Sequence, residues 1–345
     1  MTYNELKDYA LVVGIDHYPD YGSNGRNLNG AVRDAKLFAE WLMDTTTGGG
    51  LPAANCEIIT STEDSNRLTA DTIDGAFARL WQAAKNANGG RRLYMFFSGH
   101  GQVVDGPNYS ILEQSLCLPA WSFMRPNCAV STDNLSEIAI KCMPFEEVAV
   151  FLDCCRVSTI RVKALPTSVG CPLFQDGHHE IKKQVFYAAE PLKKAYEDGD
   201  EGAVHGHFTK ALIQGLKTGT NRNGGGISAK DLWGHLKYWV KKNADDANHN
   251  QKPVTNPPTP YEDMVFGRAK PIDISTNFEI RFHDWRDSHI QLLDPETNIV
   301  REGRSSDGPW MVQLHTGMHM LLDKQTEEML SFVFRSEMEG KYVTF

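Results

Sequence analysis

Two short apolar runs, each followed by a polar turn, stand out in the first half of the chain. One covers residues 93–97 and leads into Ser98-Gly99-His100-Gly101, and the other covers residues 148–152 and leads into Asp153-Cys154-Cys155-Arg156. An apolar run of this length between polar residues is typical of a buried strand in a parallel sheet. Because such sheets place their chemistry at the carboxyl ends of the strands, the pattern predicts a histidine and a cysteine close together at one edge.

Strand and helix patterns alternate over most of the chain around these two runs. Further apolar runs predict strands at residues 10–16, 56–60 and 184–189. Apolar positions three and four residues apart predict helices over residues 31–43, 69–85, 208–216 and 228–241, with Thr69 and Ser228 as N-caps. This order predicts an α/β fold with a mainly parallel central sheet flanked by helices.

The pattern changes from about residue 271. Residues 278–282, 290–292 and 311–314 alternate apolar and polar positions, and turn residues recur between them. Short alternating segments at this spacing predict a small antiparallel β-sandwich. We therefore expect a catalytic domain over residues 1–268 and a β-sandwich accessory domain over residues 271–345 that contributes no catalytic group.

Composition narrows the classes of function. The 345 residues are 41% hydrophobic, enough for a substantial core, and the formal net charge is −9 with no block of Lys and Arg. Nucleic-acid binding is therefore not expected. No apolar run is long enough to span a bilayer and Met1–Asp8 lacks a signal pattern, so we expect no membrane association and a cytoplasmic location. The seven cysteines lack disulfide-scaffold spacing, which favours reduced thiols and predicts no metal site.

The paired His and Cys motifs point to nucleophilic catalysis. A thiol acts as a nucleophile at neutral pH when a base or an imidazolium lies beside it. A single buried cysteine is usually inert packing, and a single turn histidine often bonds only the backbone. The two motifs at the ends of two strands favour a catalytic pair over these alternatives.

These residues resemble those of the caspase-like cysteine peptidases, most closely the metacaspases and the bacterial orthocaspases. The chain has the Asp of the metacaspase motif at Asp153 and the Arg of the caspase motif at Arg156. Both motifs place the nucleophile directly before the basic residue, which selects Cys155 rather than Cys154. His100 precedes Cys155 by 55 residues, against about 50 in the caspase signature. The resemblance covers roughly residues 8–266.

The resemblance implies roles for further residues. It implies that Cys155 is the nucleophile and His100 the general acid and base, with the backbone N–H groups of Cys155 and Gly101 as the oxyanion hole. It also implies a specificity pocket formed by the following residues: Asp34, Asp153, Ser98, Ala31, Tyr196 and Glu197. The acidic side chains of Asp34, Asp153 and Glu197 predict cleavage after Arg or Lys. The structural alternatives are a helix N-terminal acid for Asp34 and a strand-end cap for Asp153.

The segment from Val157 to Lys183 lies where caspases carry the linker that is cut on activation. A loop of this length inside a compact domain is usually functional or disordered. With a basic specificity the candidate autocleavage sites are Arg161, Lys163 and Lys183. The alternative is a surface loop that is never cut.

The resemblance also bears on effectors and partners. No cofactor is expected to be required, but many metacaspases are activated by calcium, and residues 197–201 carry oxygen ligands; a solvated acidic loop is the alternative. The expected partner is a protein substrate. Bacterial relatives act in cell death and phage defence, some beside pore-forming proteins, so a pore-forming or toxin-like effector is a candidate substrate. The sequence leaves the oligomeric state open.

Three other hypotheses remain at this point. One is a caspase-fold peptidase with non-basic specificity. Another is a catalytically silent caspase-like binding module that works through its C-terminal β-domain. The third is a non-proteolytic thiol enzyme of the doubly wound class, which is disfavoured because no Gly-x-Gly-x-x-Gly follows the first strand.

Overall fold

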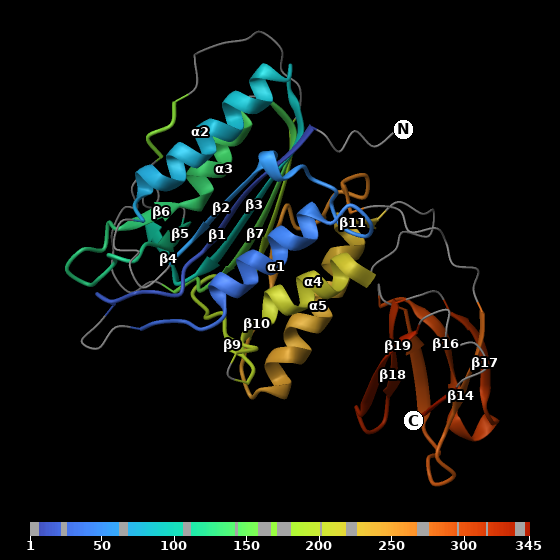
Figure 1. Ribbon diagram of the computed structural model, residues 1–345. Helices are drawn as coiled ribbons and strands as arrows, with labels where there is room; N and C mark the ends of the chain where they lie inside the picture. The colour runs from blue at the N-terminus through green and yellow to red at the C-terminus, as the bar shows by residue number, and fades with distance from the viewer. Residues whose placement is uncertain are drawn as a thin grey trace. The chain divides into compact units, whose positions relative to one another are not determined.

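The computed structural model shows an α/β unit and a β-rich unit (Figure 1). It describes residues 7–21, 26–61, 68–105, 112–141, 144–157, 167–170, 181–200, 202–218, 226–267, 276–294, 297–314, 317–334 and 342–345. The first unit contains residues 1–213 and 239–260, and the second contains residues 214–238 and 261–345. This division assigns residues 214–238 to the second unit. The sequence pattern instead places the domain boundary near residue 270, and that boundary stays a prediction.

A six-stranded sheet forms the centre of the first unit. Its order is β12-β8-β7-β3-β1-β2. The strands are β1 (Asp8–Gly14), β2 (Cys56–Thr60), β3 (Gly90–Gly99), β7 (Phe145–Cys154), β8 (Lys182–Tyr187) and β12 (Val254–Asn256). All neighbours pair in parallel except β12, which pairs with β8 antiparallel at the edge. The predicted mainly parallel sheet is therefore confirmed, and the proline-rich residues 257–260 follow an edge strand, where a missing N–H is tolerated.

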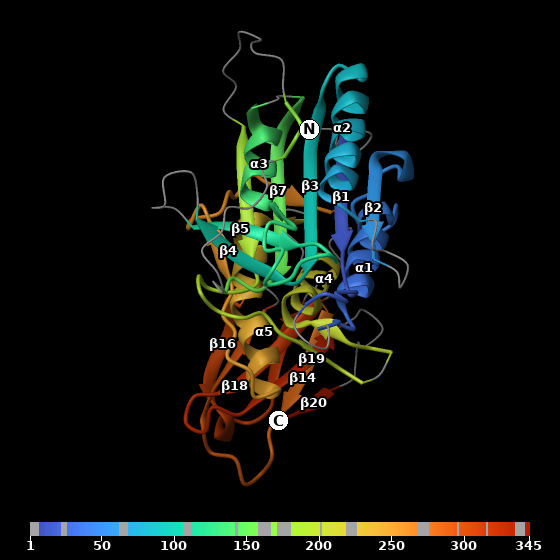
Figure 2. The same cartoon turned by 90° about the vertical axis from the view of Figure 1, so that its left-hand side faces the viewer.

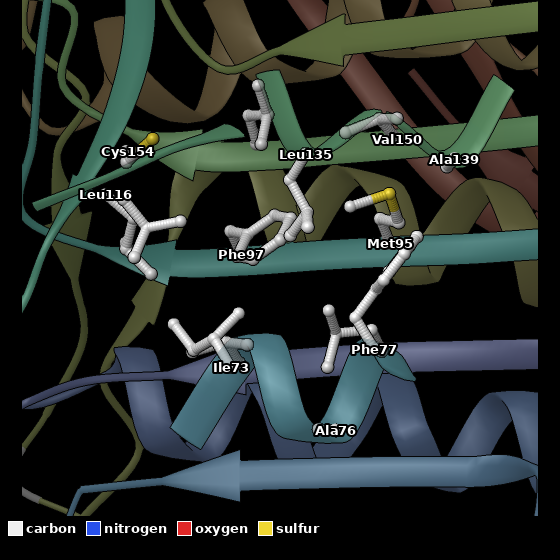
Figure 3. Packing of buried hydrophobic residues seen from close by; sticks show 14 of the residues in the cluster. Ile73, Ala76, Phe77, Met95, Phe97, Leu116, Leu135, Ala139, Val150 and Cys154 are labelled. Atoms are coloured by element: carbon white, nitrogen blue, oxygen red, sulfur yellow. The ribbon is translucent and has the colours of Figure 1, made fainter. Parts of the chain in front are cut away.

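Helices cover both faces of this sheet (Figures 1 and 2). On one face lies α1 (Ala31–Met43), whose Phe38 stacks on Phe96 of β3 with ring centroids 4.7 Å apart. The other face carries α2 (Ala70–Asn86) and α3 (Thr132–Lys141). Figure 3 shows Ile73 and Phe77 of α2 facing Met95 and Phe97 of β3. Alternate residues of the strands thus supply two separate cores, as expected for a sheet buried on both faces.

A small sheet and the start of α4 (His207–Thr218) lie near the carboxyl ends of the central strands. The small sheet contains β4 (Gly101–Asp105), β5 (Leu112–Cys117) and β6 (Ala129–Ser131). The helix α4 follows the two-stranded ribbon of β9 (Glu197–Asp198) and β10 (His205–Gly206). The helix α5 (Ala229–Asp246) begins after β11 (Ile227–Ser228), which pairs with β13 (Val265–Phe266). The hydroxyl of Ser228 accepts the Asp231 N–H at 3.0 Å, as the predicted N-cap requires.

The C-terminal part of the second unit is a β-sandwich. One sheet has the order β17-β14-β20 and the other the order β16-β15-β18-β19. The strands are β14 (Thr276–Arg281), β15 (His289–Leu293), β16 (Ile299–Arg304), β17 (Trp310–Leu314), β18 (Gly317–Asp323), β19 (Met329–Phe334) and β20 (Tyr342–Thr344). Phe278, Trp310 and Leu321 belong to its buried core. The predicted antiparallel pairing holds except for β14 and β20, which run parallel.

None of the described helices combines the length and apolarity needed to cross a bilayer.

Candidate active site

The histidine and cysteine motifs meet at the carboxyl edge of the central sheet. Strands β3 and β7 are neighbours, and their register places Gly99 opposite Cys154. His100 and Cys155 directly follow these strands, and both line one cavity of about 230 Å³. The juxtaposition expected from two apolar runs is therefore present.

The two adjacent thiols have different environments. Cys154 is 2% exposed and belongs to the core, where Gln114 Nε2 donates to its Sγ at 3.3 Å. Cys155 is half-buried, and its Sγ lies 3.4 Å from both the N and the O of Ala195. Burial raises the pKa of the Cys155 thiol, so a neighbouring base is needed to generate the thiolate at neutral pH. Cys155 is the thiol whose geometry suits a nucleophile.

His100 is oriented by a backbone carbonyl that the sequence motifs do not reveal. Its Nε2 lies 2.7 Å from the carbonyl oxygen of Arg26. Since a carbonyl only accepts, Nε2 carries the hydrogen, and Nδ1 of the neutral ring keeps a lone pair that can accept a proton. Burial lowers the pKa of His100, which favours the neutral form at pH 7.

The rings of two tyrosines contact the imidazole of His100. The ring of Tyr18 lies 4.6 Å from the His100 ring, and that of Tyr21 stacks on it at 4.5 Å with an interplanar angle of 26°. The backbone N–H of His100 also donates to the hydroxyl of Tyr18 at 2.8 Å. All three contacts come from the segment after β1, which the sequence pattern identifies only as a loop.

Glycine at position 101 is required by close backbone approach. A Cβ there would lie 2.5 Å from the carbonyl oxygen of Cys155 and 2.8 Å from Cβ of Cys154. Any side chain would push β4 away from the end of β7. The predicted oxyanion donors, the N–H groups of Gly101 and Cys155, are therefore on backbone segments held in direct contact.

Three predicted pocket acids lie around the same cavity. Asp34, Asp153 and Glu197 all line it, together with Ala31, Ser98, Leu28 and Tyr196. They come from α1 and the segment before it, from β3 and β7, and from β9 and the residue before it, which the fold brings together at one edge of the sheet. The residues that the resemblance assigns to a specificity pocket thus line one cavity, and that role stays a prediction.

Each of the three acids is held by partners other than Lys or Arg. Asp34 Oδ1 lies 2.6 Å from His205 Nδ1, and its Oδ2 accepts the Gly206 N–H at 2.8 Å. Asp153 Oδ2 accepts the Thr209 hydroxyl at 2.6 Å. The Glu197 carboxylate accepts the N–H groups of Asn29 and Gly30, each at 3.0 Å.

Burial makes these acids harder to ionise. Burial, reinforced by the charge of Asp34, raises the pKa of Asp153 to about 7. Burial also raises the pKa of Asp34, although His205 opposes this, and that of Glu197. A carboxylate in such a site is stabilised by any cation that enters the cavity.

The structural alternatives for Asp34 and Asp153 fit the contacts less well. The carboxylate that accepts an N–H at the start of α1 is that of Asp16, from Val32 at 3.2 Å, whereas Asp34 faces β10. Asp153 binds Thr209 of α4 rather than capping its own strand. A Cβ on Gly206 would lie 2.2 Å from Asp153 Oδ2, so the backbone of β10 packs directly on this carboxylate.

An imidazole that the motifs do not identify forms another wall of the cavity. His249 lines it and stacks on Tyr196 with ring centroids 4.4 Å apart. His249 Nδ1 lies 2.9 Å from Nε2 of His207, a buried residue. No spacing pattern links residues 196, 207 and 249, and only the fold brings them together.

The candidate autocleavage and calcium residues are distributed differently. Arg161 and Lys163 lie outside the described residues. Lys183 lies in β8, opposite Val148 of β7, so cleavage there would cut a strand of the central sheet. Within the described ranges, no group of three or more His, Cys, Asp or Glu side chains is arranged to hold a metal, and Glu201 of the acidic segment lies outside them.

Known proteins match this chain in sequence and in fold. Residues 7–264 match the caspase domain family. A protein named as a probable protease from a Desulfuromonadales bacterium is 28% identical over 230 residues, 61% of this chain and 26% of that protein. The chain therefore spans about a quarter of the length of this curated relative. Caspase-1 from Spodoptera frugiperda aligns with 74% of this chain and 90% of its own, at 17% identity and a TM-score of 0.46. A Geobacter sulfurreducens structure aligns with 75% of this chain and 99% of its own, at 17% identity and a TM-score of 0.43.

Proposed function

Because this chain belongs to the caspase domain family, we propose that it is a cysteine endopeptidase that cleaves proteins after Arg or Lys. The observation that carries the proposal is a single cavity lined by both Cys155 and His100 and by three acids, Asp34, Asp153 and Glu197. The thiol and imidazole supply the chemistry of acyl transfer, and the acids supply the selectivity.

The proposed reaction proceeds by acyl transfer to the thiol. The Cys155 proton moves to Nδ1 of His100 as the sulfur attacks the carbonyl carbon of the substrate. The Cys155 and Gly101 N–H groups donate to the resulting oxyanion; loss of one such donor typically lowers turnover by about a hundred-fold or more. The carbon–nitrogen bond then breaks, and His100 gives its proton to the leaving amine. Water, deprotonated by His100, hydrolyses the thioester and restores the thiol.

The Arg26 carbonyl supports both protonation states of His100. It accepts the Nε2 hydrogen at 2.7 Å in the neutral ring and would stabilise the imidazolium formed during the reaction. The same contact fixes which nitrogen faces the substrate, a role that a carboxylate has in serine peptidases. Arg26 therefore positions the ring through its backbone, so that substitution of its side chain is compatible with catalysis.

Charge favours a basic residue before the scissile bond. An acidic substrate residue would add another carboxylate to a cavity where burial already raises the pKa of Asp153, Asp34 and Glu197. A guanidinium or ammonium group would instead form charge-assisted hydrogen bonds with these acids. Tyr196, beside Glu197, lines the same cavity and is proposed to contact the basic side chain.

Finer assignments complete the proposal. We place the protein among the metacaspase-like and orthocaspase-like enzymes of the cytoplasm, with a protein substrate such as a pore-forming or toxin-like effector in cell death or phage defence. No cofactor is proposed to be required. Calcium, if it acts at residues 197–201, must compete with the Asn29 and Gly30 N–H groups for the Glu197 carboxylate.

The proposal is tested most simply by comparing the two adjacent thiols. Cys155→Ala should lower cleavage of Arg-containing peptides by about a thousand-fold or more, since no other group replaces the nucleophile. Cys154→Ala is the matched control, because its thiol is buried in the core, and it should retain cleavage. Hydrolysis of peptides by purified Cys155→Ala at the wild-type rate would refute the mechanism, and so would a wild type that cleaves nothing.

Autoprocessing is a separate part of the proposal. Wild type and Cys155→Ala, incubated side by side and then analysed for new N-termini, should differ by cuts after Arg161 or Lys163 in the wild type only. Lys183 is the least favoured of the three candidates, because it lies in β8 and pairs with Val148 of β7. A wild-type chain that cleaves peptides while remaining intact would show that activation does not require the cut.

A further inference from the structure

A row of aromatic side chains leads from the catalytic histidine to the protein surface. Tyr21 stacks on His100, and the Trp121 ring lies 4.5 Å from that of Tyr21. The Phe123 ring lies 5.5 Å from Trp121 and 6.3 Å from Tyr21. None of these three aromatic residues is among those that line the acidic cavity.

The outer end of this row is exposed, although backbone hydrogen bonds hold the turn that carries it. Phe123 is 53% exposed and Met124 is 91% exposed, whereas Trp121 is fully buried. The turn connects β5 to β6 and is closed by bonds from Leu118 N to Cys128 O at 2.9 Å and from Arg125 N to Ser122 O at 3.0 Å. Trp121 thus anchors a turn that presents two adjacent large apolar side chains to solvent.

The chemistry of the proposed reaction identifies what would cover these side chains. The side chain of the substrate residue before the scissile bond enters the acidic cavity, and the backbone carbonyl carbon of that residue bonds to Cys155. His100 must then protonate the leaving amine, which belongs to the residue after the scissile bond. The leaving chain therefore begins beside the His100 ring, and the apolar row begins at the same ring.

We propose that Tyr21, Phe123 and Met124 bind the first residues after the scissile bond and favour apolar side chains there. This inference rests on the proposed function and extends it to the leaving side of the substrate. An exposed apolar pair alone would not specify a ligand; continuity with His100 specifies the occupant as the substrate chain. One apolar side chain lying partly in such a site is worth about ten-fold in kcat/KM.

The test uses internally quenched peptides with Arg before the scissile bond and varied residues after it. Peptides continuing with Gly-Gly, Leu-Gly, Gly-Leu or Gly-Asp are compared by kcat/KM in the wild type, Met124→Ser, the double variant Phe123→Ser/Met124→Ser and Met311→Ser. Met311 is the matched control, because it is an apolar side chain 59% exposed on β17 of the second unit. The single variant keeps the test valid if the double variant does not fold.

The inference predicts a preference of about ten-fold for at least one Leu peptide over Gly-Gly in the wild type. The preference should fall toward unity in the double variant, fall part of the way in Met124→Ser and persist in Met311→Ser. Equal rates for all four peptides in the wild type would overturn the inference while leaving cleavage after Arg intact. A preference that is unchanged in the Phe123 and Met124 variants would also overturn it. The same holds if those variants keep the preference but lose self-association, because the apolar pair would then bind a second copy of the chain and not the substrate. Failure to cleave any Arg peptide would contradict the proposed function itself.

Discussion

Carboxylates are buried at both ends of the central sheet, but the two ends neutralise them differently. At the amino end, Arg91 Nε donates to Asp8 at 2.7 Å and Arg92 Nε donates to Glu147 at 2.7 Å. At the carboxyl end, among the described residues, the partners bonded to Asp34, Asp153 and Glu197 are His205, backbone N–H groups and the Thr209 hydroxyl. Acids with arginine partners stabilise a fold, whereas acids left around a cavity leave a position for an external cation.

The difference has an energetic consequence. Removing one member of a buried ion pair leaves an uncompensated charge and costs about 3 to 5 kcal/mol of stability. An acid without a cation ionises less readily, and burial accordingly raises the pKa of Asp153 to about 7. Arg91 and Arg92 oppose the burial that raises the pKa of Asp8 at the amino end, whereas Asp153 at the carboxyl end has no such partner and gains affinity for a positive charge.

The largest expected effect of breaking this contrast is on selectivity. Asp153→Asn should lower kcat/KM for Arg and Lys peptides by about a hundred-fold, because truncating one partner of a buried charge pair costs several kcal/mol. Glu147→Gln, at the other end of the same strand, is the matched control and should leave the preference for basic residues unchanged. Equal loss in both variants would indicate general destabilisation rather than a lost substrate contact.

The same two substitutions should change stability in opposite directions. Glu147→Gln removes the partner of Arg92, which is 1% exposed, and should lower the free energy of unfolding by about 3 kcal/mol. Asp153→Asn should raise it by about 2 to 4 kcal/mol above pH 7, at about 1.4 kcal/mol per pKa unit. A raised folded-state pKa makes ionisation costly, so the gain should be absent below pH 4 and complete above pH 7. Denaturant unfolding of both variants at pH 4 and pH 8 measures this, and destabilisation by Asp153→Asn at pH 8 would contradict it.

Much of this arrangement follows from the sequence because its elements are locally encoded. The bounds of α1 and β2 agree with the periodicity, and the apolar runs of β3 and β7 correctly place His100 beside Cys155. The periodicity predicts no helix over α3, because its first residues, Thr132, Asp133 and Asn134, are polar and have modest helix propensity.

The contacts that tune the site could not be predicted in this way. A backbone carbonyl such as that of Arg26 has no residue signature, so its bond to His100 is visible only in the structure. His205 meets Asp34 across 171 residues, and Glu197 meets Asn29 across 168 residues. These pairs depend on how the ribbon of β9 and β10 lies against the start of α1, which no local pattern determines.

A smaller effect is expected from pH. Because a basic substrate needs an ionised pocket, kcat/KM for Arg peptides should fall as the pH drops through about 7, the pKa of Asp153. The loss should be up to about ten-fold per pH unit below that value. Other acids with raised pKa values extend this decline. They are Asp34, Glu197 and Asp16, and the pKa of Asp16 is raised to about 6 by burial. Asp153→Asn should move the midpoint to lower pH, and an unchanged midpoint would assign the titration to another group.

The central claim is that the acids beside Cys155 select a basic residue, and substrate profiling tests it directly. Wild-type protein is incubated with a peptide library in which the residue before each potential scissile bond is varied over all types, with and without calcium, and the cut sites are mapped. We predict cuts that follow Arg or Lys and that disappear in Cys155→Ala. Cuts that follow Asp, or that follow Asp and Arg with equal efficiency, would contradict the account.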